Sequence, residues 1–370
     1  MADSGQKLAR LLDEIDALID DDETADGEIS GGWKTFHDID AAAHARAWDA
    51  YSVDLSVDTA SYRALDRTQQ DALKRVFGTI YRAESVVDDW MPRIVAAVPR
   101  SAGGASADGL GFDAMRTALE GQEHDERMHR GSLARVAEEV LGVEPADVDR
   151  FAQKHNNFVA ETLFARFNEQ MAELLRPGRS LLDLYTAIFI YGIISEDVVA
   201  NSDVVIRRAK GNSKYDEFNL PGMKEGQTNV RRDEGRHVRI AVLATHKFLA
   251  EHESAEQRLL DVSIEYMDLA DTMLRRAKAS KGLIDAHLRE SYGPDVDSLY
   301  YYAMNMKRFA VRLDELRLDE GVRQIKQRVA RAVDEFGGDG SSPIVEEPSF
   351  LVQRFGPVML KVAALTSRRG

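Results

Sequence analysis

The sequence predicts an all-α fold, a bundle of long helices with further helices packed around it. Apolar residues recur at alternating steps of three and four through most of the chain, which is the spacing of a buried helical stripe. No stretch alternates apolar and polar residues over the length of a strand. Glycine, serine and alanine gather at 101–111, between two of the periodic stretches. We expect one all-α domain.

The composition excludes several classes of site and partner. A formal net charge of −15 argues against binding to nucleic acid or to an anionic membrane surface. The chain contains no cysteine, which excludes disulfides, zinc–thiolate sites and iron–sulfur clusters. Any metal ion must therefore be held by glutamate, aspartate and histidine side chains.

Nothing in the sequence predicts export or insertion into a membrane. Residues 1–23 lack the basic and apolar regions of a signal peptide. The most apolar stretch, 181–199, is interrupted by acidic and hydroxyl side chains, so it is far from a membrane span. We therefore expect a cytoplasmic protein without a transmembrane segment.

The helical patterns follow one another along a domain that we expect to span residues 33–336. Residues 1–32 are acidic and glycine-rich toward their end and are predicted to be a weakly ordered lead-in, and residues 337–370 form a tail. The polar segment around Pro221 is expected to be a loop. Trp48 is expected on the first helix. The predicted helices span residues 38–49, 67–97, 112–141, 147–175, 180–208, 225–250, 255–281, 295–317 and 320–335.

Four of the long helices carry ionisable or polar residues inside their apolar seams. In the helix 67–97 the seam repeats at steps of four and three, and Glu84 occupies one of its central positions. A lone carboxylate at such a position is costly unless something pairs with it. The polar positions inside the four seams are, in chain order, Glu84, Gln122, Glu126, His129, Glu196, Glu234 and His237.

Two of these helices share the motif Glu-x-x-His, at 126–129 and at 234–237. Residues three apart lie on one face of a helix, so each motif can grip one metal ion. Four carboxylates cannot share a core as bare anions, because repulsion and desolvation would raise their pKa values or unfold the bundle. Two divalent ions balance the four charges, as in ferritin-like bundles, and iron or manganese suits such ligands. The predicted metal ligands are Glu84, Glu126, His129, Glu196, Glu234 and His237.

Other polar residues have supporting or competing interpretations. Asp233 is expected to orient His129 across the bundle by a hydrogen bond. Trp48 is expected either beside that pair or as a core residue. Glu161 is a weaker candidate than Glu196 for the third carboxylate, because its helix lacks a matched seam partner. In the competing interpretation the seam glutamates pair with arginines. The nearby arginines, all on other helix faces, are Arg127, Arg231, Arg232 and Arg236.

These residues resemble the ferritin-like superfamily that contains the radical-generating small subunit of class I ribonucleotide reductase. Within it, the chain is most similar to the ligand-binding oxidases, which share that subunit's fold but not its role. The resemblance covers about residues 45–320. It rests on Trp48-Asp49, Val53-Asp54, Tyr62-Arg63-Ala64-Leu65, Glu84-Ser85-Val86-Val87, Met91-Pro92, Asp125-Glu126-Arg127-Met128-His129, Tyr191 with Glu196, and Asp233-Glu234-Gly235-Arg236-His237.

The resemblance implies several properties. In the ligand-binding oxidases a tyrosine at the position of Tyr191 is joined by an ether bond to the β-carbon of a valine at the position of Val87. O₂ is the implied oxidant in a two-electron C–H oxidation, next to a long-chain fatty acid or other apolar ligand. A homodimer and an unidentified reductant are also implied. Manganese is implied at Glu84, Glu126 and His129, and iron at Glu196, Glu234 and His237, with a di-iron pair as the alternative.

Other functions of the same superfamily compete. A ribonucleotide reductase subunit usually has its radical tyrosine four residues after the first ligand histidine, where this chain has Leu133. Such subunits also usually end in an acidic tail, whereas this chain ends in 367–370, Ser-Arg-Arg-Gly. An acyl-carrier-protein desaturase uses the same ligand types. An arylamine N-oxygenase has a further histidine at the position of Val230. A non-enzymatic iron-binding or storage protein tends to be a shorter chain.

Overall fold

The computed structural model describes Ile15 and residues 34–100, 111–155, 158–201, 214–280, 282–292 and 296–337. These residues form helices and connecting loops with no strand among them, so the predicted all-α fold class is confirmed. Apart from Ile15, the predicted lead-in at residues 1–32 lies outside the described residues, as does the tail after Gly337. No helix of the described segments has the length and apolarity needed to cross a membrane.

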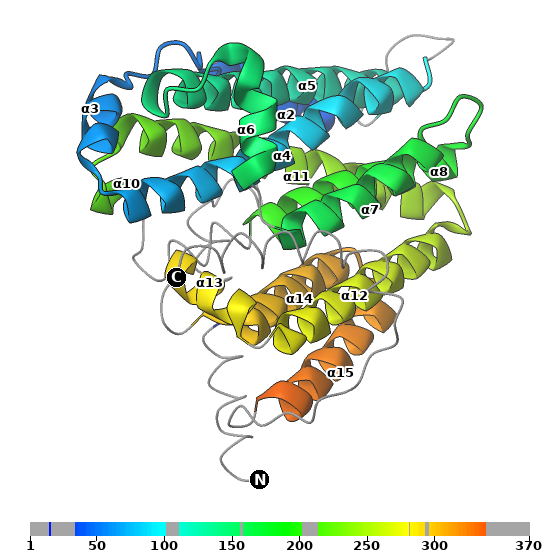
Figure 1. Cartoon of the computed structure of the whole chain (residues 1–370). Coiled ribbons are helices and arrows are strands. Elements are labelled where there is room, and N and C mark those ends of the chain that lie inside the picture. Colours follow the sequence, from blue (N-terminus) through cyan, green and yellow to red (C-terminus); the bar gives the residue numbers. More distant parts are fainter. Residues whose placement is uncertain are drawn as a thin grey trace. The chain divides into compact units, whose positions relative to one another are not determined.

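Four long helical segments build the centre of the bundle (Figure 1). α4 (Arg67–Ala97) packs along α5 (Phe112–Arg135), and α11 (Pro221–Glu251) packs against α5. The fourth segment is α8 (Leu181–Ile188), which continues into η3 (Phe189–Asn201), and η3 packs along α11. The seam residues of α4 are buried as expected, among them Phe77, Val87 and Met91. The four predicted core helices therefore face one another around a common interior.

Further helices cover this centre (Figure 1). α14 (Ser298–Glu315) packs on η3 and on α15 (Asp319–Phe336), and α12 (Ala255–Ala279) packs on both α14 and α15. α2 (Phe36–Ala45) lies against α5 and α11. The remaining elements are α3 (Ser56–Ala64), η1 (Val136–Val140), η2 (Pro145–Asp147), α6 (Val148–His155), α7 (Phe158–Leu174), α10 (Lys214–Glu217) and α13 (Leu283–Tyr292).

The expectation that Trp48 lies on the first helix is wrong. Thr35 and Asp38 form a capping box that starts α2 at Phe36, and the helix ends at Ala45, so Trp48 lies on the loop that follows. Nη1 of Arg135, on α5, holds this loop by donating to the backbone carbonyls of Ala50 at 2.5 Å and Val53 at 3.1 Å. The position of Trp48 is therefore set by α5.

The loop expected around Pro221 is instead the first turn of α11. The buried Asp58, on α3, accepts hydrogen bonds from the backbone N–H groups of Gly222 at 2.9 Å and Met223 at 2.8 Å. These are amides that the first turn of a helix leaves without an internal partner. Asp58 thus acts as an N-cap supplied from a distant part of the chain. Local turn signals could not reveal such a cap.

The segment η3 is a π-helix, whereas the sequence predicts an ordinary α-helix there. A π-helix makes i→i+5 hydrogen bonds, so residues five apart come to lie on one side. Tyr191 and Glu196 are five apart, and in an α-helix they would point about 140° away from each other. Gly192, between them, lies so close to α11 that an added Cβ would overlap the Cβ of Ala241. The π-helix and this close approach together bring Tyr191 and Glu196 toward the interior.

We expect the substitution Gly192→Ala to destabilise the protein by about 1–3 kcal/mol, because the new methyl group must push η3 away from α11. Gly131→Ala is the matched control, since an added Cβ at Gly131 on α5 meets nothing within 4 Å. It should be neutral or stabilising, by up to about 1 kcal/mol. Urea unfolding of both variants measures the difference. Equal stability of the two variants would contradict a tight contact at Gly192.

Candidate metal centre

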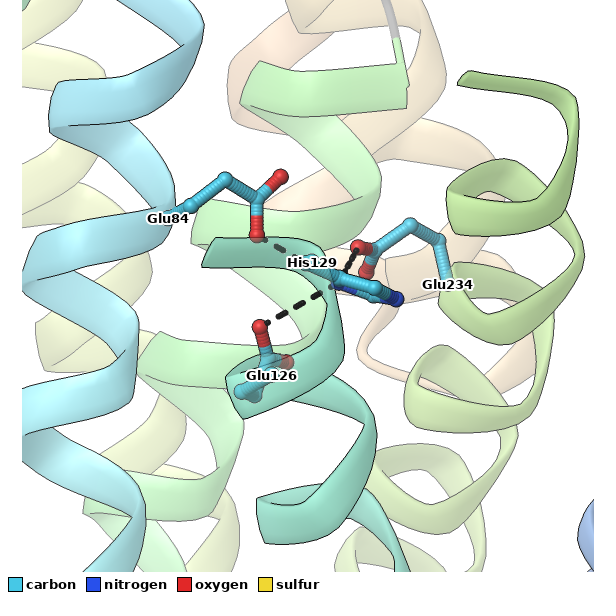
Figure 2. A group of neighbouring side chains, drawn as sticks. All are labelled: Glu84, Glu126, His129 and Glu234. Atoms are coloured by element: carbon cyan, nitrogen blue, oxygen red, sulfur yellow. Dashed lines mark ion pairs between the residues drawn. The ribbon is translucent and has the colours of Figure 1, made fainter. Parts of the chain in front are cut away.

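The six predicted ligand residues come together in the middle of the bundle. They are Glu84 of α4, Glu126 and His129 of α5, Glu196 of η3, and Glu234 and His237 of α11. One ligand atom from each of Glu84, Glu126, His129 and Glu234 lies within 4.8 Å of the other three. Figure 2 shows these three carboxyl groups around the ring of His129. The side chain of Glu161, the weaker candidate, lies outside the described residues.

Both imidazole rings turn Nδ1 toward the carboxylates. Nδ1 of His129 is 3.3 Å from Glu84 Oε2, 3.5 Å from Glu126 Oε2 and 3.3 Å from Glu234 Oε1. Nδ1 of His237 is 3.1 Å from Glu126 Oε1 and 3.2 Å from Glu234 Oε2. Glu126 and Glu234 therefore each offer one oxygen to each ring. Glu84 adds a carboxylate beside His129.

The other ring nitrogens, Nε2, donate to two aspartates. His129 donates to Asp233 Oδ2 at 3.0 Å, and His237 donates to Asp125 Oδ2 at 3.2 Å. When a ring holds a single proton, these bonds keep it on Nε2 and leave the lone pair on Nδ1, which is the tautomer that binds a metal ion. Trp48 also donates from Nε1 to Asp233 at 2.7 Å, and its ring stacks on His129 with centroids 6.4 Å apart.

Tyr191 adds a phenol to the same cluster. Its hydroxyl donates to Glu126 Oε1 at 2.5 Å and accepts a hydrogen bond from Nε2 of Gln122 at 2.7 Å. The Tyr191 and Gln122 side chains are both buried. Burial, with the nearby carboxylate of Glu126, raises the pKa of Tyr191 well above its usual range, so the phenol stays protonated. Val87 is also buried, one turn after Glu84 on α4.

The carboxyl groups of the cluster differ in the direction in which their pKa values are shifted. Burial raises the pKa of Glu84 to about 7, and burial beside Glu234 raises the pKa of Glu196 well above its usual range. Burial acts on Glu126 in the same direction, but the imidazoles of His237 and His129 outweigh it and lower its pKa. Both imidazole pKa values are raised by the surrounding carboxylates despite burial. Without cations, protons therefore supply the balancing positive charge.

This donor set fits two divalent cations. Nδ1 of His129 and Oε2 of Glu126 are buried, and neither has a hydrogen-bond partner in the described part of the chain. Buried polar atoms without a hydrogen-bond partner destabilise the folded protein unless a ligand binds to them. Four carboxylates and two imidazoles are also the ligand types that iron and manganese accept, and the two rings mark two neighbouring positions. The arrangement can therefore hold a pair of ions.

The structure adds two residues that the sequence analysis did not assign. Asp125 precedes the first Glu-x-x-His motif as Asp233 precedes the second, and each aspartate accepts from the histidine of the opposite motif. That repetition was a usable signal for Asp125. Arg236, one of the arginines of the competing interpretation, is buried and pairs with both aspartates rather than with a seam glutamate.

Comparison with solved structures identifies the fold. An R2-like ligand-binding oxidase with aerobically reconstituted metal cofactor after photoconversion matches with a TM-score of 0.57 and 17% identity, over 79% of this chain and 96% of that one. The chain has the ferritin-like fold of the R2-like oxidases. Two variants with anaerobically reconstituted Mn/Fe cofactor match at 17% and 18% identity with TM-scores of 0.59 and 0.58, over 79% of this chain and 96% and 97% of theirs. No protein-family model and no curated protein matches the sequence.

We expect the addition of Mn(II) to chelator-treated protein to release protons, because the ligands must deprotonate to bind. The groups with raised pKa values are Glu84, Glu196, His129 and His237. Mn(II) affinity should therefore fall as the pH is lowered, and Glu84, whose pKa is about 7, should add to the loss near that pH. A pH indicator in weakly buffered solution measures the release.

The variant Glu84→Gln should release fewer protons, whereas Glu120→Gln, at an exposed position on α5, should behave as the wild type. Mn(II) binding without proton release would contradict the protonation of the cluster described above.

Proposed function

We propose that this chain is a dinuclear metal oxidase that uses O₂ to oxidise a C–H bond by two electrons. One observation carries the proposal: two imidazole Nδ1 atoms and four carboxyl groups meet in the buried centre of an R2-like fold. The proposed metal ligands are Glu84, Glu126, His129, Glu196, Glu234 and His237.

Each part of the proposed site has its own task. Glu126 and Glu234 face both imidazoles, so they are suited to bridge two ions. Glu84, beside His129, and Glu196, beside Glu234, are suited to the two ends of the cluster. When bound, a pair of iron or manganese ions supplies the electrons that reduce O₂. Apolar residues on the same helices, such as Val87 and Ile193, limit the access of water.

We propose a manganese ion at the His129 position and an iron ion at the His237 position, with two iron ions as the alternative. Two of the solved R2-like oxidases carry a Mn/Fe cofactor, which supports the mixed pair. Ligand type alone does not choose between the two metals, because selection also depends on geometry and availability.

Metal content per chain tests the proposed centre. Protein purified after growth with both metals should hold two ions, one iron and one manganese, by elemental analysis. His237→Ala should lower the content to at most one ion, and His44→Ala should leave it unchanged, because the His44 side chain is exposed and pairs with Asp40. Two irons would favour the di-iron alternative. Well-folded wild-type protein without bound metal would overturn the proposal.

We also propose that Tyr191 and Val87 become joined by an ether bond. The phenol oxygen of Tyr191 lies 2.5 Å from Glu126, which brings it next to the metal-binding carboxylates. Val87 lies one turn from Glu84, on the helix that supplies the end of the cluster. The bond would form between Tyr191 Oη and Val87 Cβ with loss of one hydrogen from each atom, and O₂ would take the two electrons and the protons.

The cross-link has a mass signature. After loading with metal in air, the protein should lose a pair of hydrogens and yield a linked peptide that contains both Val87 and Tyr191. Tyr191→Phe should abolish the linked peptide because it removes the phenol oxygen. Tyr185→Phe, a buried tyrosine on α8, should retain it. Separate peptides from well-loaded wild-type protein would rule out the cross-link while leaving the metal centre standing.

The bound organic ligand, the oligomeric state and the cellular location are further parts of the proposal. The solved relatives are described as ligand-binding, so we propose a long-chain fatty acid or a similar apolar molecule as the ligand of this chain. Organic extraction of purified protein followed by mass spectrometry tests this. A homodimer stays a prediction from the resemblance, and light scattering tests it. A cytoplasmic location stays a prediction from the sequence, which contains neither a signal-peptide pattern nor a membrane span.

The rival functions differ at particular residues. Leu133, at the position of the radical tyrosine in ribonucleotide reductase subunits, is buried among apolar side chains. Val230, at the position of the further histidine of arylamine N-oxygenases, is also buried. Both weigh against those rivals. Oxygen consumption coupled to a change in a bound apolar molecule separates an oxidase from an iron store.

A further inference from the structure

The buried Arg236 connects the two halves of the candidate centre. Its Nη2 atom donates to Asp233 Oδ1 at 2.5 Å and to Asp125 Oδ2 at 2.9 Å. Only 2% of the side chain is exposed, and its Nε and Nη1 atoms have no hydrogen-bond partner among the described residues. The guanidinium is therefore held at one nitrogen, by the two carboxylates together.

The two aspartates belong to opposite motifs. Asp233 accepts from His129, and Asp125 accepts from His237. A continuous series of hydrogen bonds thus runs from His129 through Asp233, Arg236 and Asp125 to His237. Every member lies on α5 or α11, so the series crosses between the helices that carry the two Glu-x-x-His motifs.

The two ends of this series are not equivalent. Asp233 is buried and also accepts from Trp48, so it takes hydrogen bonds from three side chains. The Asp125 side chain is 15% exposed and accepts from Arg236 and His237 alone among the described residues. The His129 end is therefore the more rigid of the two.

We infer that Arg236 is a positioning residue that couples the filling of the two metal positions, an inference that rests on the proposed function. An ion at one position orients its imidazole and the aspartate behind that ring. Through its hydrogen bonds to both carboxylates, Arg236 also fixes the orientation of the second aspartate. The second imidazole is then already oriented when the next ion binds. Without Arg236, two carboxylates lose their common cation, and each ring is oriented independently.

Anaerobic titration of chelator-treated protein with Mn(II) alone tests the inference. The electron paramagnetic resonance signal of free Mn(II) measures how much of the metal remains unbound. Wild-type protein should bind two ions, the second at least as tightly as the first. Arg236→Met should weaken binding of the second ion relative to the first by about tenfold to a hundredfold. Arg127→Met is the matched control, because Arg127 is exposed in the same type of motif and, within the described part of the chain, bonds to Glu123 alone. It should match the wild type.

Two further variants separate positioning from general loss of structure. Arg236→Lys should restore part of the coupling, because a single ammonium nitrogen can donate to both aspartates as Nη2 does. Asp125→Asn should also weaken binding of the second Mn(II) ion relative to the first. The double variant with Arg236→Met should differ little from either single variant, because both substitutions interrupt the same series of hydrogen bonds. Circular dichroism checks that each variant folds.

The outcomes distinguish the inference from the function it rests on. If wild-type protein binds no Mn(II), the proposed metal centre fails. If wild-type protein binds two ions and the folded Arg236→Met and Asp125→Asn variants give the same ratio of dissociation constants, the centre stands and the coupling is wrong.

Discussion

The gathering of four glutamate side chains in the interior, three of them buried and Glu84 partly exposed, is the constraint on which the rest of this structure depends. Anions brought out of water at such short range repel strongly, and the core can keep them only if positive charge enters with them. The raised pKa values of Glu84, Glu196 and the two imidazoles favour protons at these groups when no cation is bound, and the proposed divalent ions would take their place. The stability of the bundle and its affinity for cations therefore have the same origin.

The sequence was sufficient to single out the six proposed ligand residues, which the structure brings together, because each of them interrupts an otherwise apolar helical seam. Glu84 could be assigned from its own helix alone, since a carboxylate in the middle of a buried stripe needs a partner. The two Glu-x-x-His motifs then required the helices to face one another. The ferritin-like fold class followed from the requirement that these helices face one another and from the absence of any strand pattern in the sequence.

The features that the sequence analysis missed all depend on contacts between distant segments. The start of α11 is capped by Asp58, more than 160 residues earlier. Trp48 lies on the loop after α2, and Arg135 of α5 holds that loop through the carbonyls of Ala50 and Val53. Arg236 lies off the ligand stripe of its own helix, and only the position of α5 makes it a partner of Asp125. Periodicity describes one helix at a time, so none of these contacts was available to it.

The π-helical turn of η3 has a consequence for how this site can change. Tyr191 and Glu196 point the same way only because the helix holds more residues per turn than an α-helix does. If the segment took the common α form at its present length, the two side chains would point about 140° apart. Loss of one residue between them would leave them four apart, which is the spacing that shares one face of an α-helix. The chemistry of this wall of the site is therefore encoded in the length of the segment as much as in its residues. A chain one residue shorter there keeps both side chains on one face in an ordinary α-helix, so a gap at this point of an alignment marks a change of helix type.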